Sequence, residues 1–204
     1  MGRVLDTLHG RLVHGRRVEV LSRHLAELMP EGARVLDVGC GDGLITSLVG
    51  GRRPDVDVSG IDIATRSETH VPVREFDGLH IPAGDGEVDV VMLVDVLHHA
   101  EDPHALLAEA VRAAGRAVVL KDVMTLGPGS DATLRFMDWV GNARHGVPLP
   151  YRFWSQDDWR RAFAELGVDV DAERRRIGLY PPPFNLVFER RMHFIVRILP
   201  PRPT

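Results

Sequence analysis

The stretch that most limits how this chain folds is a short apolar run that ends in a cluster of glycines. Residues 35–43 read Val-Leu-Asp-Val-Gly-Cys-Gly-Asp-Gly, and an apolar helical pattern follows over residues 44–49. Glycine permits a tight turn and lets a ligand lie directly on the backbone. The helix N-terminus behind the turn carries free N–H groups that suit a ligand carboxylate. This stretch predicts a strand, a glycine turn and a helix, with a ligand site at the turn.

Strand-like and helix-like segments alternate around this unit. The patterns predict strands at 56–63, 74–76, 88–94 and 117–120, and helices at 16–29 and 103–114. The nearly continuous apolar run at 88–94 is typical of a parallel strand buried on both faces. Such alternation predicts a doubly wound, mostly parallel α/β sheet. The link 63–73 is near the minimum length for a right-handed crossover, so we expect a shortened helix or an extended crossover there.

The pattern changes after residue 121. Residues 123–154 hold a Gly-Pro-Gly turn, a helical pattern over 131–139 and a stretch rich in glycine, proline and aromatic residues. A helix should follow, with Ser155 as its N-cap, Asp158 in a near capping box and Gly167 at its end. Late strands are predicted at 168–170 and 193–198. We interpret residues 1–204 as one domain in which 123–154 forms a lid over the substrate.

Two residues separate the ligand of the glycine turn from a dinucleotide. The dinucleotide fingerprint needs a third glycine where this chain has Leu44. It also has no use for Asp37, a charge near the end of a buried strand. A ligand ammonium group would give Asp37 a partner and lower its burial cost. A ligand with both an ammonium and a carboxylate group is an amino acid.

Further acidic residues follow the next two strands. Asp62 ends the second strand, where a carboxylate accepts hydrogen bonds from ribose hydroxyls, and Asp77 follows the third, where it would accept from an adenine amino group. Either residue alone is as easily a turn former. Their occurrence at successive strand ends favours a ligand site, because sheets of this class bind ligands at the carboxyl ends of their strands.

The motifs VLDVGCGDG, GIDI, EFDG and VDVVMLVDVLHHAEDP resemble the class I S-adenosylmethionine-dependent methyltransferases over residues 16–121. The resemblance implies a Rossmann-like sheet of seven strands with an antiparallel last strand. It implies S-adenosylmethionine as the cofactor. Its methionine part would lie on the loop, its ribose at the end of the second strand and its adenine at the end of the third, with a further contact after the fourth. The implied cofactor residues are Asp37, Gly39, Cys40, Gly41, Asp62, Ile63, Asp77, Gly78 and Asp95.

Candidate catalytic residues follow the fourth and fifth strands. His99 is a candidate general base for a hydroxyl acceptor, although it is more commonly a helix-start residue, and His98 is a weaker candidate. The two adjacent histidines lack cysteine or carboxylate partners at ligand spacing, so no metal is expected. Lys121, the sole lysine, would orient an acidic or phenolic acceptor or form a solvent-facing ion pair. In the lid, His145 and Tyr151 are candidates for the acceptor pocket.

Composition narrows the function further. A net charge of -4 lacks the basic footprint of a nucleic-acid binder, and no apolar run is long enough to cross a membrane. A single cysteine suits the cytoplasm, and the arginine excess suits a GC-rich bacterial genome. We therefore expect methyl transfer to an oxygen, nitrogen or carbon of a small molecule, with the oligomeric state open. The alternatives are a non-catalytic cofactor-binding sensor or partner subunit and, less favoured, a nicotinamide-dependent reductase.

Overall fold

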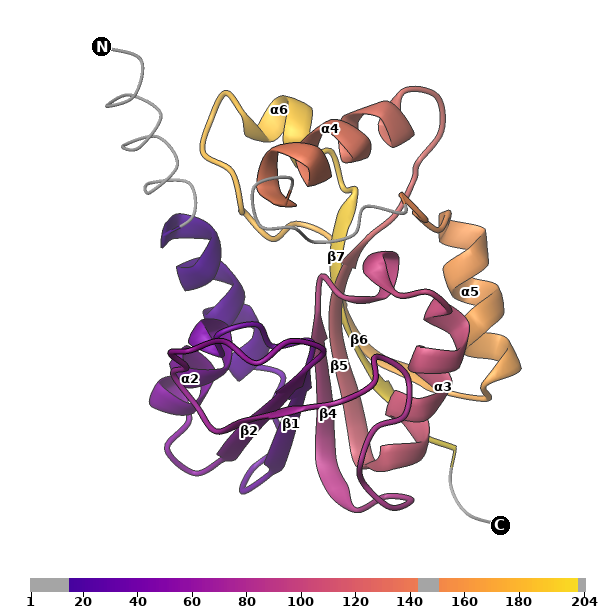
Figure 1. The fold of residues 1–204 in the computed structure, drawn as a ribbon. Coiled ribbons are helices and arrows are strands. Elements are labelled where there is room, and N and C mark those ends of the chain that lie inside the picture. The colour runs from indigo at the N-terminus through magenta and orange to yellow at the C-terminus, as the bar shows by residue number, and fades with distance from the viewer. Residues whose placement is uncertain (1–14, 143–150, 202–204) are drawn as a thin grey trace.

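A twisted sheet of seven strands forms the centre of the computed structural model, which describes residues 15–142 and 151–201 (Figure 1). The strand order is β3-β2-β1-β4-β5-β7-β6. The strands are β1 (Arg34–Val38), β2 (Asp57–Asp62), β3 (Val73–Glu75), β4 (Val88–Val94), β5 (Ala114–Val123), β6 (Asp169–Arg174) and β7 (His193–Leu199). Strands β1 to β5 pair in parallel, and β7 runs antiparallel to both β5 and β6. This arrangement confirms the predicted fold class and the antiparallel last strand.

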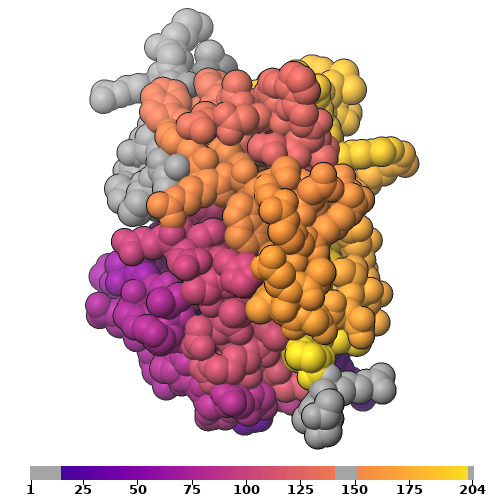
Figure 2. All heavy atoms as spheres, turned by 90° about the vertical axis from the view of Figure 1, so that its right-hand side faces the viewer, coloured from indigo at the N-terminus to yellow at the C-terminus, as the bar shows by residue number. Residues whose placement is uncertain are grey.

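Helices cover both faces of the sheet. The helical residues 15–26 and α2 (Leu44–Arg52) pack on one face, where side chains such as Leu21, Leu25 and Val49 join Val90 and Val119 in one apolar cluster. On the other face, α3 (Pro103–Ala113) and α5 (Gln156–Glu165) build a second cluster. Figure 2 shows α3 and α5 side by side over that face. The two-sided cover explains why β4 is apolar at every position except Asp89.

The predicted ends of α5 are confirmed. The Ser155 hydroxyl caps the helix by accepting from the Asp158 N–H, and the Asp158 carboxylate accepts from the Ser155 N–H in return. Gly167 has φ of +63° after the last turn. Both ends therefore follow from local side-chain chemistry.

The crossover between β2 and β3 is extended and contains no helix, as its length predicts. It lies across the glycine turn: the His70 N–H donates to the Asp42 carbonyl at 2.8 Å, and Val71 fills the space above Gly43. Two short elements were not predicted, namely η1 (Leu97–His99) and α6 (Asn185–Phe188). Their few residues carry too little periodicity for a sequence pattern to reveal them.

The segment predicted to be a lid begins as a continuation of the core. Val123 ends β5, and Met124 is 1% exposed. Helix α4 (Ser130–Asn142) then lies beside α6 above the sheet (Figure 1). A small apolar cluster holds it there, formed by Val123, Leu134 and Met192 with Met137 and Phe153 against them. No helix of the described residues is both long and apolar enough to span a bilayer.

Candidate active site at the carboxyl edge of the sheet

The turn after β1 is shaped by glycine at the position closest to β4. Gly39 has φ of +73°, and a Cβ atom added there would lie 2.6 Å from Cγ2 of Val96. A larger residue would be both strained and displaced, so glycine is required for geometry as well as for access. Next in the turn, the Cys40 thiol packs against Gly60 of β2, and burial raises the pKa of this thiol to about 12. Cys40 therefore fills space and is no nucleophile at neutral pH.

Asp37 is a buried carboxylate that the described residues satisfy only halfway. It is 2% exposed, and the Thr46 hydroxyl donates to its Oδ2 atom. Its Oδ1 atom has no hydrogen-bond partner among the described residues. Burial raises the pKa of Asp37 to about 7. A cationic donor beside Oδ1 would remove this burial penalty, which fits the ammonium group expected at this turn.

Asp62 ties the end of β2 to the glycine turn. Its Oδ2 atom accepts a hydrogen bond of 2.7 Å from the Gly41 N–H, and its Oδ1 atom accepts from the Ala64 N–H at 3.1 Å. These two bonds hold the carboxylate at the sheet edge, where it keeps lone pairs for ribose hydroxyls. Next to it, Ile63 is 57% exposed and touches the site of a Cβ on Gly78, so both form an open apolar ledge.

Asp77 already has local partners. Its Oδ1 atom accepts from the N–H groups of Leu79 and His80, and its Oδ2 atom lies 2.7 Å from Nδ1 of His80. The hydrogen bond from His80 is the main reason why the pKa of Asp77 falls to about 2. The turn-forming role is therefore present in the structure, and the contact with adenine remains a prediction.

A partly buried ionic network lies beyond β4, and it centres on Asp95. Asp95 has φ of +58°, which is rare for a residue with a side chain. Its carboxylate forms ion pairs with Lys121 of β5 and with Arg17 of the N-terminal helical residues. Burial would raise the pKa of Asp95, but the two cations hold it well below its usual range. This network brings the N-terminal helix to the sheet edge.

Lys121 is fully buried, so the solvent-facing ion pair considered for it is wrong. Its ammonium group contacts Asp95 and lies 3.2 Å from Nδ1 of His193. The other ring nitrogen of His193 lies 3.1 Å from the Phe188 carbonyl, so His193 is neutral with the proton on Nε2. Burial, together with the nearby Lys121, lowers the pKa of His193 well below its usual value. Lys121 thus holds Asp95 in place from inside the protein.

Two histidine–aspartate pairs lie after β4 and β5. Nδ1 of His98 is 2.6 Å from Oδ1 of Asp122, and both residues are buried. Asp122 also accepts from the Leu97 N–H at 3.1 Å and from the Val123 N–H at 2.7 Å. Burial lowers the pKa of His98, but the Asp122 carboxylate outweighs it and the pKa is raised overall. Nε2 of His99 lies 3.5 Å from Oδ1 of Asp138 on α4.

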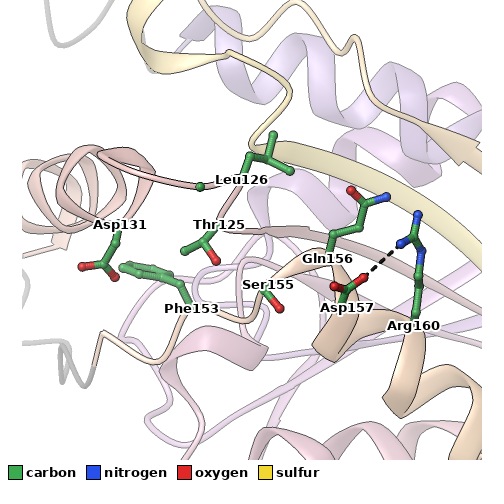
Figure 3. A pocket seen from close by; sticks show the side chains of 9 residues that line it. Thr125, Leu126, Asp131, Phe153, Ser155, Gln156, Asp157 and Arg160 are labelled. Carbon is green, nitrogen blue, oxygen red and sulfur yellow. Dashed lines mark hydrogen bonds and ion pairs between the residues drawn. The ribbon is translucent and has the colours of Figure 1, made fainter.

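The remaining lid candidates lie around these pairs. The Phe153 ring is 5.6 Å from the His98 ring and 6.3 Å from the Tyr151 ring, so Tyr151 reaches the pairs only through Phe153. His145 lies outside the described residues. Phe153 also lines a hollow of about 790 Å³. Figure 3 shows Asp157 and Arg160 of α5 paired with each other at this hollow. None of the expected cofactor residues lines this hollow.

Three contributors were missed by sequence reasoning. Arg17 reaches Asp95 from a helix with no motif, and Arg66 of the crossover lies above Gly41, 3.3 Å from the place of a Cβ. Asp138 comes to His99 from α4. Of these three, only Arg17 could have been suspected from the sequence. It lies beside the buried face of an amphipathic helix, where a charged side chain is usually paired with an opposite charge.

Comparison with known proteins agrees with this geometry. The model of the methyltransferase domain matches residues 12–173. The chain belongs to this family. The chain also has the seven-stranded, mostly parallel fold that its motifs predict.

Individual relatives differ in their acceptors. The ubiquinone biosynthesis O-methyltransferase of Psychrobacter cryohalolentis is 31% identical over 104 residues, which are 42% of this chain and 38% of that protein. The ribosomal RNA small subunit methyltransferase C of Chromohalobacter salexigens is 30% identical over 174 residues, which are 83% of this chain and 47% of that protein. The match thus spans less than half of either relative. A methyltransferase from Thermotoga maritima shares the fold with a TM-score of 0.65 and 16% identity, over 97% of this chain and 96% of that one.

Proposed function

We propose that this methyltransferase transfers the methyl group of S-adenosylmethionine to a hydroxyl oxygen of a small molecule. The observation that carries the proposal is the pair of imidazole–carboxylate contacts, His98–Asp122 and His99–Asp138, at the edge of the sheet next to the glycine turn. A hydroxyl group must lose its proton to become a good nucleophile, and groups of this type promote that loss.

The cofactor would lie along the edge from Asp37 to Asp77. Oδ1 of Asp37 is suited to its ammonium group, and Asp62 to its ribose. When bound, the cofactor supplies a methyl group on a positively charged sulfur. The protein holds donor and acceptor in line, which is the main source of rate in such a transfer.

The position of η1 indicates where the acceptor would bind relative to the cofactor. Val96, two residues after the end of β4, touches Gly39, and η1 begins at the next residue. His98 and His99 therefore lie close in sequence to the residue that borders the cofactor turn. Helix α4 covers the same region through Asp138. We propose that α4 and the other described residues of the segment 123–154 act as the lid over this acceptor; residues 143–150 of this segment lie outside the described residues.

The name of the Psychrobacter relative, an O-methyltransferase, agrees with an oxygen acceptor. The name of the Chromohalobacter relative points to ribosomal RNA, which is the second candidate. The net charge of -4 favours the small molecule, because RNA binding draws on clustered positive charge.

A labelling experiment tests the proposal. The purified protein is incubated with methyl-labelled S-adenosylmethionine and, in separate arms, a panel of phenols and other alcohols, a panel of amines, and unmodified ribosomal RNA. We expect label on a hydroxylated compound and a loss of at least tenfold in turnover with His99→Ala. Label on RNA or on an amine overturns the oxygen assignment. Binding of S-adenosylhomocysteine without turnover in any arm would make the protein a cofactor-binding sensor.

A further inference from the structure

Three metal-ligating side chains converge at the acceptor side of the sheet. They are His98 and His99 of η1 and Asp138 of α4. Each offers one ligand atom, and these three atoms all lie within 4.8 Å of one another. The two imidazole rings are 4.1 Å apart between centroids. His98 and Asp138 are buried and His99 is partly buried, so this cluster is shielded from most of the solvent.

Two imidazoles and one carboxylate form a ligand set that suits a divalent transition metal. Zinc sites with three protein ligands of this kind keep a fourth position open for water or substrate. Ligand atoms at about 2.1 Å from a tetrahedral ion lie about 3.4 Å apart, so the most distant pair of ligand atoms, now within 4.8 Å, would approach by up to about 1.4 Å on binding. The carboxylate of Asp138 is on a lid helix that is held by a small cluster, which makes such an approach inexpensive.

The environment of His98 provides a second, independent observation. Histidines that bind metals usually donate their other ring N–H to a carboxylate, which fixes the tautomer and aims the free nitrogen at the ion. Nδ1 of His98 is 2.6 Å from Oδ1 of Asp122. Asp122 is itself fixed by two backbone N–H groups, those of Leu97 and Val123. His98 is therefore oriented with Nε2 left for a ligand.

The charge of the cluster points the same way. Asp122 and Asp138 are each 8% exposed or less. They bring two carboxylates into a buried region beside two imidazoles. With neutral imidazoles the four side chains sum to two negative charges. A divalent cation balances this sum, so the histidines need not be protonated.

We propose that His98, His99 and Asp138 bind a divalent transition-metal ion, with zinc as the reference ion, and that Asp122 positions His98. The ion would lower the pKa of an acceptor hydroxyl that enters its open position, so that this hydroxyl would release its proton to bulk water before its oxygen takes the methyl group from the sulfur of the cofactor. This last role rests on the proposed function, whereas the metal site does not. The adjacent histidines alone predict no metal, and α4 supplies the missing carboxylate.

Binding is tested on the full-length protein without an affinity tag, with Zn²⁺ as the probe. Calorimetry and elemental analysis after dialysis should give one equivalent per chain. Asp138→Asn and His99→Ala should each weaken Zn²⁺ binding by at least tenfold. Asp122→Asn should weaken it by about 10–100-fold, the usual effect of removing such a positioning carboxylate.

His104→Ala is the matched control. His104 also pairs with a carboxylate, at 3.1 Å from Glu165, but this pair is exposed and belongs to no cluster among the described residues. Its Zn²⁺ affinity should equal that of the unchanged protein. Binding of S-adenosylhomocysteine shows for each variant that the fold is intact. Co²⁺ in place of Zn²⁺ gives a further readout, because its visible absorption reports the coordination number. We expect this absorption to change in Asp138→Asn.

Two outcomes overturn the metal site. One is the absence of stoichiometric Zn²⁺ binding, and the other is binding that Asp138→Asn and His99→Ala leave unchanged in folded protein. The proposed function fails separately. If Zn²⁺ binds as expected but no hydroxyl is methylated, the site stands without the oxygen chemistry. If metal-free protein with no Zn²⁺ affinity methylates a hydroxyl at full rate, the oxygen chemistry stands without the site.

Discussion

Asp37 is a charge that the fold buries and only half satisfies. Its raised pKa means that the folded state binds a proton more tightly than the unfolded chain does. The contribution of Asp37 to the stability is therefore undiminished below about pH 4, falls as the pH rises toward about 7, and is constant above that value. The burial of Asp37 lowers the stability of the free protein near neutral pH. A bound ligand cation would offset this cost, which gives a reason for a buried carboxylate at this position.

We expect Asp37→Asn to stabilise the free protein at pH 8 by on the order of 2 kcal/mol, because the neutral amide avoids burying a charge. The gain should shrink toward zero at pH 4. Urea unfolding at both pH values measures it. The same variant should lose affinity for S-adenosylhomocysteine by calorimetry. A variant that is less stable than the unchanged protein at pH 8 would show that the burial penalty is small.

Asp62 has two roles in the proposed cofactor site. It accepts a hydrogen bond from the Gly41 N–H, and it would accept hydrogen bonds from the ribose. Asp62→Ala should weaken binding of S-adenosylhomocysteine by about 1.5–3 kcal/mol, the range for hydrogen bonds to a charged group. Asp57→Ala is the control, because this substitution removes the same charge from the same strand. Asp57 begins that strand at its opposite, exposed end. Equal affinities in the two folded variants would mean that the ribose is held elsewhere.

At the scale of elements, α4 differs from the strands that it covers. Leu134 joins the small apolar cluster with Val123 and Met192, and Met137 packs against this cluster, while Phe136 and Trp139 are more than half exposed. An element with so few buried contacts opens more easily than a central strand. We therefore expect α4, the helix of the proposed lid, to open more easily than the sheet that it covers.

Hydrogen exchange tests this difference. In the free protein, the amides of α4 should exchange faster than those of β4. Protection should change little with S-adenosylhomocysteine alone, and it should rise when the acceptor found by labelling is added, because closure excludes water from the transfer. If α4 is as protected as β4 in the free protein, the segment is core and the lid proposal fails.

At the scale of the whole molecule, the site is assembled from distant parts of the chain. The glycine turn, the ends of β2 and β4 and the N-terminal helix meet at one edge of the sheet. The Arg17–Asp95 ion pair joins the N-terminal helix to the end of β4. A ligand seated there contacts several elements at once. It should therefore stabilise the domain as a unit.

S-adenosylhomocysteine at about 100 times its Kd should raise the Tm by about 5–10 °C, from the mass-action gain of about 2.7 kcal/mol. NADH at the same concentration should leave the Tm unchanged, because Leu44 occupies the place of the third glycine of a dinucleotide fold. Differential scanning calorimetry gives both values. A shift with NADH and none with S-adenosylhomocysteine would contradict the assignment of the cofactor.

The sequence by itself determined the sheet, its helices and the edge that carries the site. These features depend on local rules: apolar runs mark strands, Ser155 and Gly167 mark helix ends, and the glycines of the first turn mark a close backbone approach. Asp37, Asp62 and Asp77 were found in the same way, because each lies at or near the carboxyl end of a predicted strand. Their contacts with the cofactor stay predictions.

The tertiary structure alone decided which side chains meet. Lys121 resembled a surface cation and is instead buried against Asp95 and His193. Asp138 and Arg17 reach the edge from helices that no motif marks. A pattern of residues records the periodicity of one element, but the distance between side chains on different elements depends on how those elements pack. For that reason the sequence predicts no metal, whereas the packed structure brings His98, His99 and Asp138 together.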